Sequence, residues 1–205
     1  MIRIGLTGPT GAGKGSLSRI FEKHGITCHD TDKVSRLVCA PGKPCTLKLA
    51  EEFGCDLIDS NGVLDRKALA SRVFGAPDRD ERLKKLNTIT HKYILAYADD
   101  WLCEKEKSGF AAAVVDAPVL FESGYDKKCD YVIGVLAGKA TRIKRVTERD
   151  NIGNEEAEKR ISAQKDDEFF IKSCSLIIYN DGSEDELENK VLPYIKSLLN
   201  GVIPT

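Results

Sequence analysis

The sequence predicts an α/β fold in which a five-stranded parallel sheet is flanked by helices and carries helical additions. Two observations lead to this prediction. The apolar run at residues 2–7 breaks into a glycine-rich turn and then into a helical pattern that Gly25 ends. Further short apolar runs alternate with helical patterns, which is the order typical of a parallel sheet.

The glycine-rich turn, GPTGAGKGS at residues 8–16, has the spacing of a P-loop. In this motif consecutive backbone N–H groups surround phosphates, the following helix points its N-terminus at them, and the lysine reaches the outer phosphates. A glycine-rich turn without a ligand is disfavoured, because the full motif lies between a strand and a helix. We expect the binding residues to be Gly11, Ala12, Gly13, Lys14, Gly15 and Ser16.

One position departs from the usual P-loop. Gly15 stands where a hydroxyl residue normally follows the lysine and binds Mg²⁺. Adenylate-kinase-like P-loops also carry glycine there and hold magnesium more through water. We therefore assign Ser16 to a phosphate contact and leave its direct ligation of the metal open.

Two carboxylates follow the second predicted strand, at residues 26–29. Asp30 and Asp32 lie at its carboxyl end, the edge where ligands bind in an open α/β sheet, so one of them is a candidate base for a phosphoryl acceptor. Asp30 also precedes the helical pattern of residues 33–39 and suits an N-cap. Both roles stay open for the pair, and we choose Asp32 for catalysis because capping explains only one aspartate.

Residues 41–109 change character and predict a helical insertion. PGKP and NGVLDRKAL each introduce a helical stretch, and a long charged helix follows from residue 78 to residue 107. Its apolar positions recur at helical spacing and form one face, for which core packing is the default. They are Leu83, Leu86, Thr90, Tyr93, Tyr97 and Trp101.

The third strand, AAAVVD, ends at Asp116 and is typical of a Walker B strand. A buried parallel strand beside the P-loop delivers a carboxylate that orients magnesium or its waters. The alternative is an ordinary aspartate at a strand end, which the neighbouring P-loop disfavours.

Four arginines follow the fourth strand, YVIGVLA. Arg142, Arg145 and Arg149 share one face of a helix at residues 139–150, and Arg160 lies on the next helix. They suggest a lid that neutralises charge during phosphoryl transfer. The alternative to a lid role, for any single arginine, is that it lies on a solvent-exposed face of the helix and pairs with a glutamate. A fifth strand at residues 176–179 and a structural helix at about 183–199 complete the pattern.

Composition limits the partners and the compartment. Seven cysteines without a CxxC pair predict free thiols and no zinc site. A net charge of −1 argues against nucleic acid as the main partner. No stretch approaches the roughly 20 apolar residues of a membrane span. The P-loop begins too early for a signal peptide, so we expect a cytoplasmic protein.

The order of motifs resembles the dephospho-coenzyme A kinases almost end to end. The matching segments are GPTGAGKGS, HDTDKVSR, GVLDRKAL with VF, ITH, VVDAPVLFESG, RIKRVTERDN with EEAEKRISAQ, and YNDGS. Besides Gly15, the departure is Lys92, where a proline commonly follows ITH. Lysine permits a continuous helix around His91 where proline would bend one.

The resemblance implies transfer of the γ-phosphoryl group of ATP, with Mg²⁺, to the ribose 3′-hydroxyl of dephospho-coenzyme A. Lys14 and Arg149 would stabilise the transferring group and Asp32 would receive the hydroxyl proton. The acceptor would be bound by Asp30, Asp32, Arg66 and His91, and the metal by Ser16 and Asp116 through water. Residues 1–40 and 110–205 would form the nucleotide-binding core, with a lid at about 145–165, and residues 41–109 the acceptor-binding insertion.

Three other functions are weighed against this one. Another small-molecule P-loop kinase is disfavoured by DAPVLFESG, and a GTPase-like switch by the absence of a guanine-reading NKxD motif. A non-catalytic nucleotide-binding module would not explain Asp32, Asp116 and the lid arginines together. The sequence leaves the oligomeric state open, with a monomer favoured, and the expected partners are the two small-molecule substrates.

Overall fold

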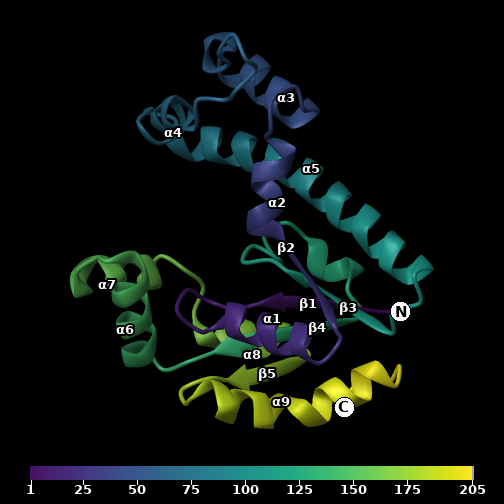
Figure 1. Cartoon of the computed structure of the whole chain (residues 1–205). Helices are drawn as coiled ribbons and strands as arrows, with labels where there is room; N and C mark the ends of the chain where they lie inside the picture. The colour runs from purple at the N-terminus through teal and green to yellow at the C-terminus, as the bar shows by residue number, and fades with distance from the viewer. Residues whose placement is uncertain (205) are drawn as a thin grey trace. The chain divides into compact units, whose positions relative to one another are not determined.

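The computed structural model describes residues 1–204, which form two compact units (Figure 1). The first unit contains residues 1–29 and the chain from residue 102 onward, and the second contains residues 30–101. Each unit is described by itself below. The functional boundaries expected at 40/41 and 109/110 stay a prediction.

The first unit is built on the sheet that the sequence predicts. Its strands are β1 (Ile2–Thr7), β2 (Thr27–Asp30), β3 (Ala112–Asp116), β4 (Tyr131–Leu136) and β5 (Leu176–Tyr179). They lie in the order β2-β3-β1-β4-β5, and the pairs of β1 with β3 and β4, and of β4 with β5, are parallel. The central position of β1 makes its carboxyl end the topological switch point, where ligands bind in such sheets.

One face of this sheet packs against α1 (Lys14–Lys23) and α9 (Glu184–Leu199) (Figure 1). From α1, Leu17, Ile20 and Phe21 join a buried cluster with alternate residues of the strands. Burying each such side chain stabilises the fold by about 1.5–3 kcal/mol. Ser183 caps α9 by accepting a hydrogen bond from the Glu186 N–H at 3.2 Å.

The other face is covered by short elements. The loop after β3 buries Leu120, and the 3₁₀ turn η2 (Tyr125–Lys128) buries Tyr125. Leu120 lies so close to β1 that a Cβ on Gly5 would be 2.7 Å from it. The sequence did not predict α8 (Asp167–Ser173), whose Phe170 is buried and packs edge-on with Phe169. Its seven residues give too few turns for periodicity to reveal.

Two more helices complete the first unit, and both were predicted. They are α6 (Lys139–Asp150) and α7 (Asn154–Ser162), joined by a turn in which Asn151 is left-handed. The long helix α5 (Arg79–Lys107) belongs partly to each unit and is continuous through Lys92, as the absence of proline allows.

The second unit is helical, with α2 (Thr31–Val38), α3 (Pro44–Phe53), the 3₁₀ turn η1 (Cys55–Leu57) and α4 (Arg66–Phe74) beside α5. Asp65 caps α4 by accepting from the N–H groups of Lys67 and Ala68. The predicted core role is confirmed for Leu83, Leu86 and Tyr93, which pack against a cluster of buried residues. The predicted core role is wrong for Tyr97, which is 44% exposed. None of the helices in residues 1–204 is both long and apolar enough to cross a bilayer.

Candidate active site

The loop after β1 has the backbone conformation of a phosphate cradle. Gly8, Gly11 and Gly13 have φ values of 152°, 78° and 96°. Residues with side chains rarely adopt these angles, and a Cβ on Gly11 would lie 2.7 Å from the Arg142 carbonyl oxygen. Gly13 is the N-cap of α1, which begins at Lys14 without a side-chain cap. With no side-chain cap over them, the N–H groups of Lys14 and Gly15 remain available to an anion, whereas the Ser16 N–H donates to the Gly13 carbonyl oxygen at 3.0 Å.

Lys14 and Asp116 are brought together, as the Walker B prediction requires. Parallel pairing aligns Leu6 of β1 with Asp116 of β3, so the carboxylate lies beside the start of the loop. The Lys14 ammonium forms an ion pair with Asp116 Oδ1, and the two side chains are 17% and 7% exposed. Ser18 Oγ donates to Asp116 Oδ2 at 2.8 Å. Ser18 was not among the site residues predicted from the sequence, although its position four residues after Lys14 places it on the same face of α1.

Gly15 and Ser16 lie in the first turn of α1. Gly15 has no left-handed φ, and a Cβ there would meet no atom within 4 Å. Ser16 Oγ accepts from Arg19 Nη2 at 3.1 Å. The position of Gly15 therefore has room for a serine, and the predicted contacts of Ser16 with phosphate and metal stay predictions.

The first two arginines of α6 hold the outer side of the loop. Arg142 is 5% exposed, and its Nε donates to the Thr10 carbonyl oxygen at 3.0 Å. Burial lowers the pKa of Arg142, and Asp167, 3.4 Å from Nη1, opposes that shift. Arg145 Nη1 donates to the Asn180 carbonyl at 2.9 Å and lies 3.3 Å from the Ala12 carbonyl. A solvated basic face is therefore wrong for Arg142, which is buried against the loop.

Asn180 is the second site residue that was not predicted from the sequence. It follows β5, is 4% exposed, and donates from Nδ2 to the Ala12 carbonyl at 2.8 Å. Together with Arg145 it fixes the outer carbonyl groups of the loop. Because a peptide is planar with N–H opposite C=O, holding the Ala12 carbonyl directs the Gly13 N–H away from Arg145 and Asn180. The YNDGS motif was noted, but nothing in it indicates a partner 168 residues away.

The last arginines lie at the carboxyl end of α6 and on α7. Arg149 donates to both carboxylate oxygens of Asp150, at 2.8 and 2.9 Å, and its Nη2 is 3.3 Å from Thr10 Oγ1. Arg160 Nη1 donates to Asp150 at 3.0 Å. The hydrogen bond to Asp150 raises the pKa of Arg149, and the same contact lowers the pKa of Asp150. Arg149 is therefore a cation within reach of the loop.

The other predicted site residues belong to the second unit. Asp30 Oδ1 accepts from the N–H groups of Asp32 and Lys33 at 3.0 and 3.3 Å, which confirms the predicted N-cap of α2. Asp32 lies exposed in the first turn of α2, and Arg66 is the first residue of α4. His91 is half-buried in α5. The catalytic and substrate-binding roles of these residues stay predictions.

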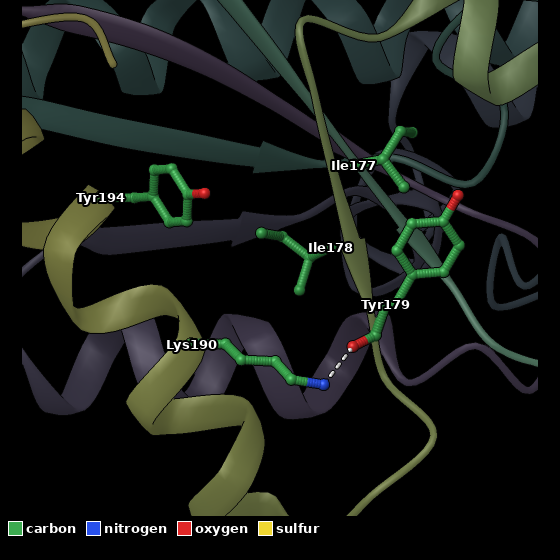
Figure 2. A pocket seen from close by; sticks show the side chains of 5 residues that line it. All are labelled: Ile177, Ile178, Tyr179, Lys190 and Tyr194. Atoms are coloured by element: carbon green, nitrogen blue, oxygen red, sulfur yellow. Dashed lines mark hydrogen bonds between the residues drawn. The ribbon is translucent and has the colours of Figure 1, made fainter. Parts of the chain in front are cut away.

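A separate pocket of about 330 Å³ lies between β5 and α9 (Figure 2). Figure 2 shows Lys190 extended toward the backbone of Tyr179, whose carbonyl oxygen accepts from Nζ at 3.1 Å. The other lining residues are Ile177, Ile178 and Tyr194. No predicted site residue lines this pocket.

The residues around the loop fit a nucleotide phosphate accompanied by a divalent cation. The loop offers backbone N–H groups and one ammonium, and Asp116 and Ser16 offer the oxygen atoms that Mg²⁺ prefers. Within residues 1–204, no cluster of three or more histidine, cysteine, aspartate or glutamate side chains is placed to hold a metal. A magnesium ion would therefore take most of its ligands from phosphate and water.

Comparison with known proteins identifies the family. A sequence model described as dephospho-CoA kinase matches residues 2–186. The chain is 33% identical over 202 residues to the dephospho-CoA kinase of Corynebacterium glutamicum, covering 98% of this chain and 100% of that one. The chain belongs to the dephospho-CoA kinase family. It is also 36% identical over 192 residues to the dephospho-CoA kinase of Geobacter metallireducens, with 94% of each chain covered.

Solved structures agree with this membership. TT1252 from Thermus thermophilus matches with a TM-score of 0.78 and 27% identity, covering 96% of this chain and 97% of that one. The dephospho-CoA kinase from Campylobacter jejuni matches with a TM-score of 0.72 and 26% identity over 97% and 98%. Shikimate kinase from Acinetobacter baumannii, at 16% identity and a TM-score of 0.52, shows the shared P-loop kinase fold alone. The predicted fold, family and activity are thus confirmed: the chain is an ATP-binding kinase that phosphorylates dephospho-CoA, the final step of coenzyme A biosynthesis.

Proposed function

We propose that the chain transfers the γ-phosphoryl group of ATP directly to the ribose 3′-hydroxyl of dephospho-CoA. The observation that carries this proposal is the pairing of Lys14 with Asp116 beside the glycine cradle. Phosphoryl transfer needs little covalent catalysis by the protein. Positioning the substrates and neutralising the charge of the transferring group therefore supply most of the acceleration.

On the nucleotide side, residues 11–16 bind the phosphates, mainly through backbone N–H groups, and Lys14 follows the transferring group. Lys14 exchanges its contact with Asp116 for a phosphate oxygen, which leaves the carboxylate to orient waters together with Ser16. Mg²⁺, when bound, neutralises charge on the outer phosphates. The fixed outer carbonyls of the loop support this role, because a preorganised donor array needs no rearrangement during transfer.

On the acceptor side, Asp32 receives the proton of the 3′-hydroxyl. Asp30 already fills the cap of α2, so the capping function does not require the Asp32 carboxylate. Arg66 and His91, with Asp30, bind the acceptor. The cationic Arg66 suits its anionic phosphates.

Arg149 supplies further positive charge to the transition state. Its contact with Thr10 Oγ1 supports this role, because it brings the guanidinium to the loop. In its bond to the partly buried Asp150 the Arg149 side chain is 60% exposed, and a solvent-exposed cation exchanges partners at little cost. The segment at about 145–165 acts as a lid whose closure over both substrates limits hydrolysis of ATP.

We also propose that the chain works in the cytoplasm as a monomer, with its two substrates as its partners and no nucleic acid or membrane among them. Its seven cysteines are free thiols, which suits a reducing compartment.

Product mapping tests the proposal. The protein is incubated with ATP, Mg²⁺ and dephospho-CoA, and the product is treated with a phosphatase that removes only ribose 3′-phosphates. We expect that treatment to regenerate dephospho-CoA. A product resistant to it, or ADP release without a phosphorylated acceptor, would contradict transfer to the 3′-hydroxyl.

A further inference from the structure

Two cysteines of the second unit are brought together by a tight turn. Helix α2 ends at Val38 with Cys39 as its C-cap, and α3 begins at Pro44. Between them the Lys43 N–H donates to the Ala40 carbonyl at 3.2 Å. Pro41 and Gly42, with φ of 71° at Gly42, occupy the central positions that these residues favour in a type II turn. The turn reverses the chain and places Cys39 beside Cys45.

The two sulfur atoms are in contact. Cys39 Sγ and Cys45 Sγ are 3.5 Å apart. Thr46 Oγ1, which is buried, donates to the Ala40 carbonyl at 2.7 Å and holds the turn against α3. Disulfide formation requires the sulfurs to approach to about 2.05 Å. A change of about 1.5 Å is within the reach of side-chain rotation and small backbone adjustment.

The surroundings give the two thiols different roles. Cys45 is fully buried in the cluster that contains Leu49 and Leu57, whereas Cys39 is partly exposed. A hydrogen bond from the Cys45 thiol and the nearby Arg66 guanidinium lower the pKa of Cys39 to about 7, against the effect of burial. The same hydrogen bond, together with burial, raises the pKa of Cys45. Cys39 is therefore the accessible nucleophile, and Cys45 is positioned to resolve its oxidised form.

We propose that Cys39 and Cys45 form an oxidation site that takes hydrogen peroxide and closes to an intramolecular disulfide. In the first step the Cys39 thiolate attacks one peroxide oxygen, the O–O bond breaks, and water leaves after protonation, giving a sulfenic acid. In the second step the Cys45 sulfur attacks Cys39 Sγ and the S–O bond breaks. The Cys45 proton leaves with the departing hydroxide as a second water. Both sulfurs are oxidised and the peroxide is reduced to two waters.

Peptide mass measurement tests this site on the whole chain. Trypsin cuts after Arg36 and Lys48 but not at the Lys43–Pro44 bond, so one peptide, residues 37–48, contains both thiols and no other cysteine. After exposure to hydrogen peroxide at pH 7 and blocking with N-ethylmaleimide, we expect this peptide to lose two hydrogen atoms and bind no maleimide. Dithiothreitol should restore both thiols.

The rate is a second readout. At pH 7, a thiol with a pKa near 7 has about 16 times the thiolate fraction of an ordinary thiol with a pKa near 8.5. Its lower intrinsic nucleophilicity reduces that advantage to roughly threefold. We therefore expect the peptide to oxidise about three times faster than glutathione under the same conditions. The exposed Cys55 and Cys103 are internal references for general oxidation.

Single substitutions separate the two roles. In Cys45→Ser, or Cys45→Ala if serine destabilises the buried position, Cys39 should gain oxygen atoms instead of forming a disulfide. In Cys39→Ser, Cys45 should stay reduced. The proposal is overturned if the wild-type peptide keeps both thiols while Cys55 and Cys103 oxidise, or if it gains oxygen and never loses hydrogen. These readouts do not depend on kinase activity, so they test the oxidation site independently of the proposed catalytic roles.

Discussion

Replacing Lys14 by alanine should reduce catalysis and stability through two separable effects. The kinetic effect follows from the loss of the ammonium that accompanies the phosphoryl group. Removing one preorganised electrostatic contact of this kind costs about 10²–10³ in kcat. We expect a loss of that order with ATP and dephospho-CoA.

The effect on stability follows from the loss of the ion pair between Lys14 and the buried Asp116. Asp116 is buried and would lose its ion pair with Lys14, while its other contacts, among them the Ser18 hydrogen bond, would remain. Breaking a buried pair from one side costs about 3–5 kcal/mol, and the 17% exposure of Lys14 favours the lower end. For a chain of this size, about 3 kcal/mol lowers Tm by roughly 6–12 °C.

Two further variants separate these effects. Adding Asp116→Asn to Lys14→Ala removes the buried charge that Lys14 no longer balances, so the double variant should recover part of the lost Tm while kcat stays low. Lys23→Ala is the matched control on α1, because Lys23 is 63% exposed and ion pairs of such exposed groups contribute little to stability.

Steady-state kinetics and thermal melts of the wild type, Lys14→Ala, the double variant and Lys23→Ala test both effects. Near-normal kcat in folded Lys14→Ala would refute the catalytic assignment. An unchanged Tm in that variant would refute the energetic argument about Asp116.

Four further substitutions test the loop and the acceptor side. Gly15→Ser should be tolerated and should strengthen the dependence of kcat on magnesium in a metal titration, because the site has room and serine restores the usual hydroxyl. Asp32→Asn should lower kcat by about 10²–10⁴ with little change in either KM. Asp30→Asn should leave Tm almost unchanged in a thermal melt and be milder in kinetics, since asparagine caps helices about as well as aspartate. Asn180→Ala should raise the KM for ATP in steady-state titrations by about two- to tenfold, because one net hydrogen bond of about 0.5–1.5 kcal/mol to the loop is lost.

Each of these predictions has a result that would contradict it. For Gly15→Ser it is an unchanged or weaker magnesium requirement. For the two aspartates it is the reverse order, with Asp30→Asn inactive and Asp32→Asn active. For Asn180→Ala it is an unchanged KM for ATP in a variant with wild-type secondary structure.

Most of the fold was predictable because its signals are local. The strands are short apolar runs, and the cap by Asp30 depends on residues within three positions of it. The P-loop motif specifies both a conformation and a ligand, so residues 8–16 led directly to the nucleotide site. Helix α8 was missed because seven residues offer little periodicity.

The supporting contacts of the site were less accessible from sequence. Arginine usually lies at the protein surface, yet the packing of α6 against the loop buries Arg142. Asn180 acts on Ala12 only because β5 ends at the same edge of the sheet as β1. Sequence patterns identify residue types and spacing, whereas these contacts depend on the tertiary arrangement.

An ADP-release assay tests the central claim most directly. The wild-type protein is given ATP and Mg²⁺ with dephospho-CoA, AMP or cytidine, each offered separately, and ADP formation is followed by a coupled enzyme. We predict turnover with dephospho-CoA and only background release with AMP and cytidine. Turnover with AMP or cytidine and none with dephospho-CoA would contradict the assignment of the acceptor.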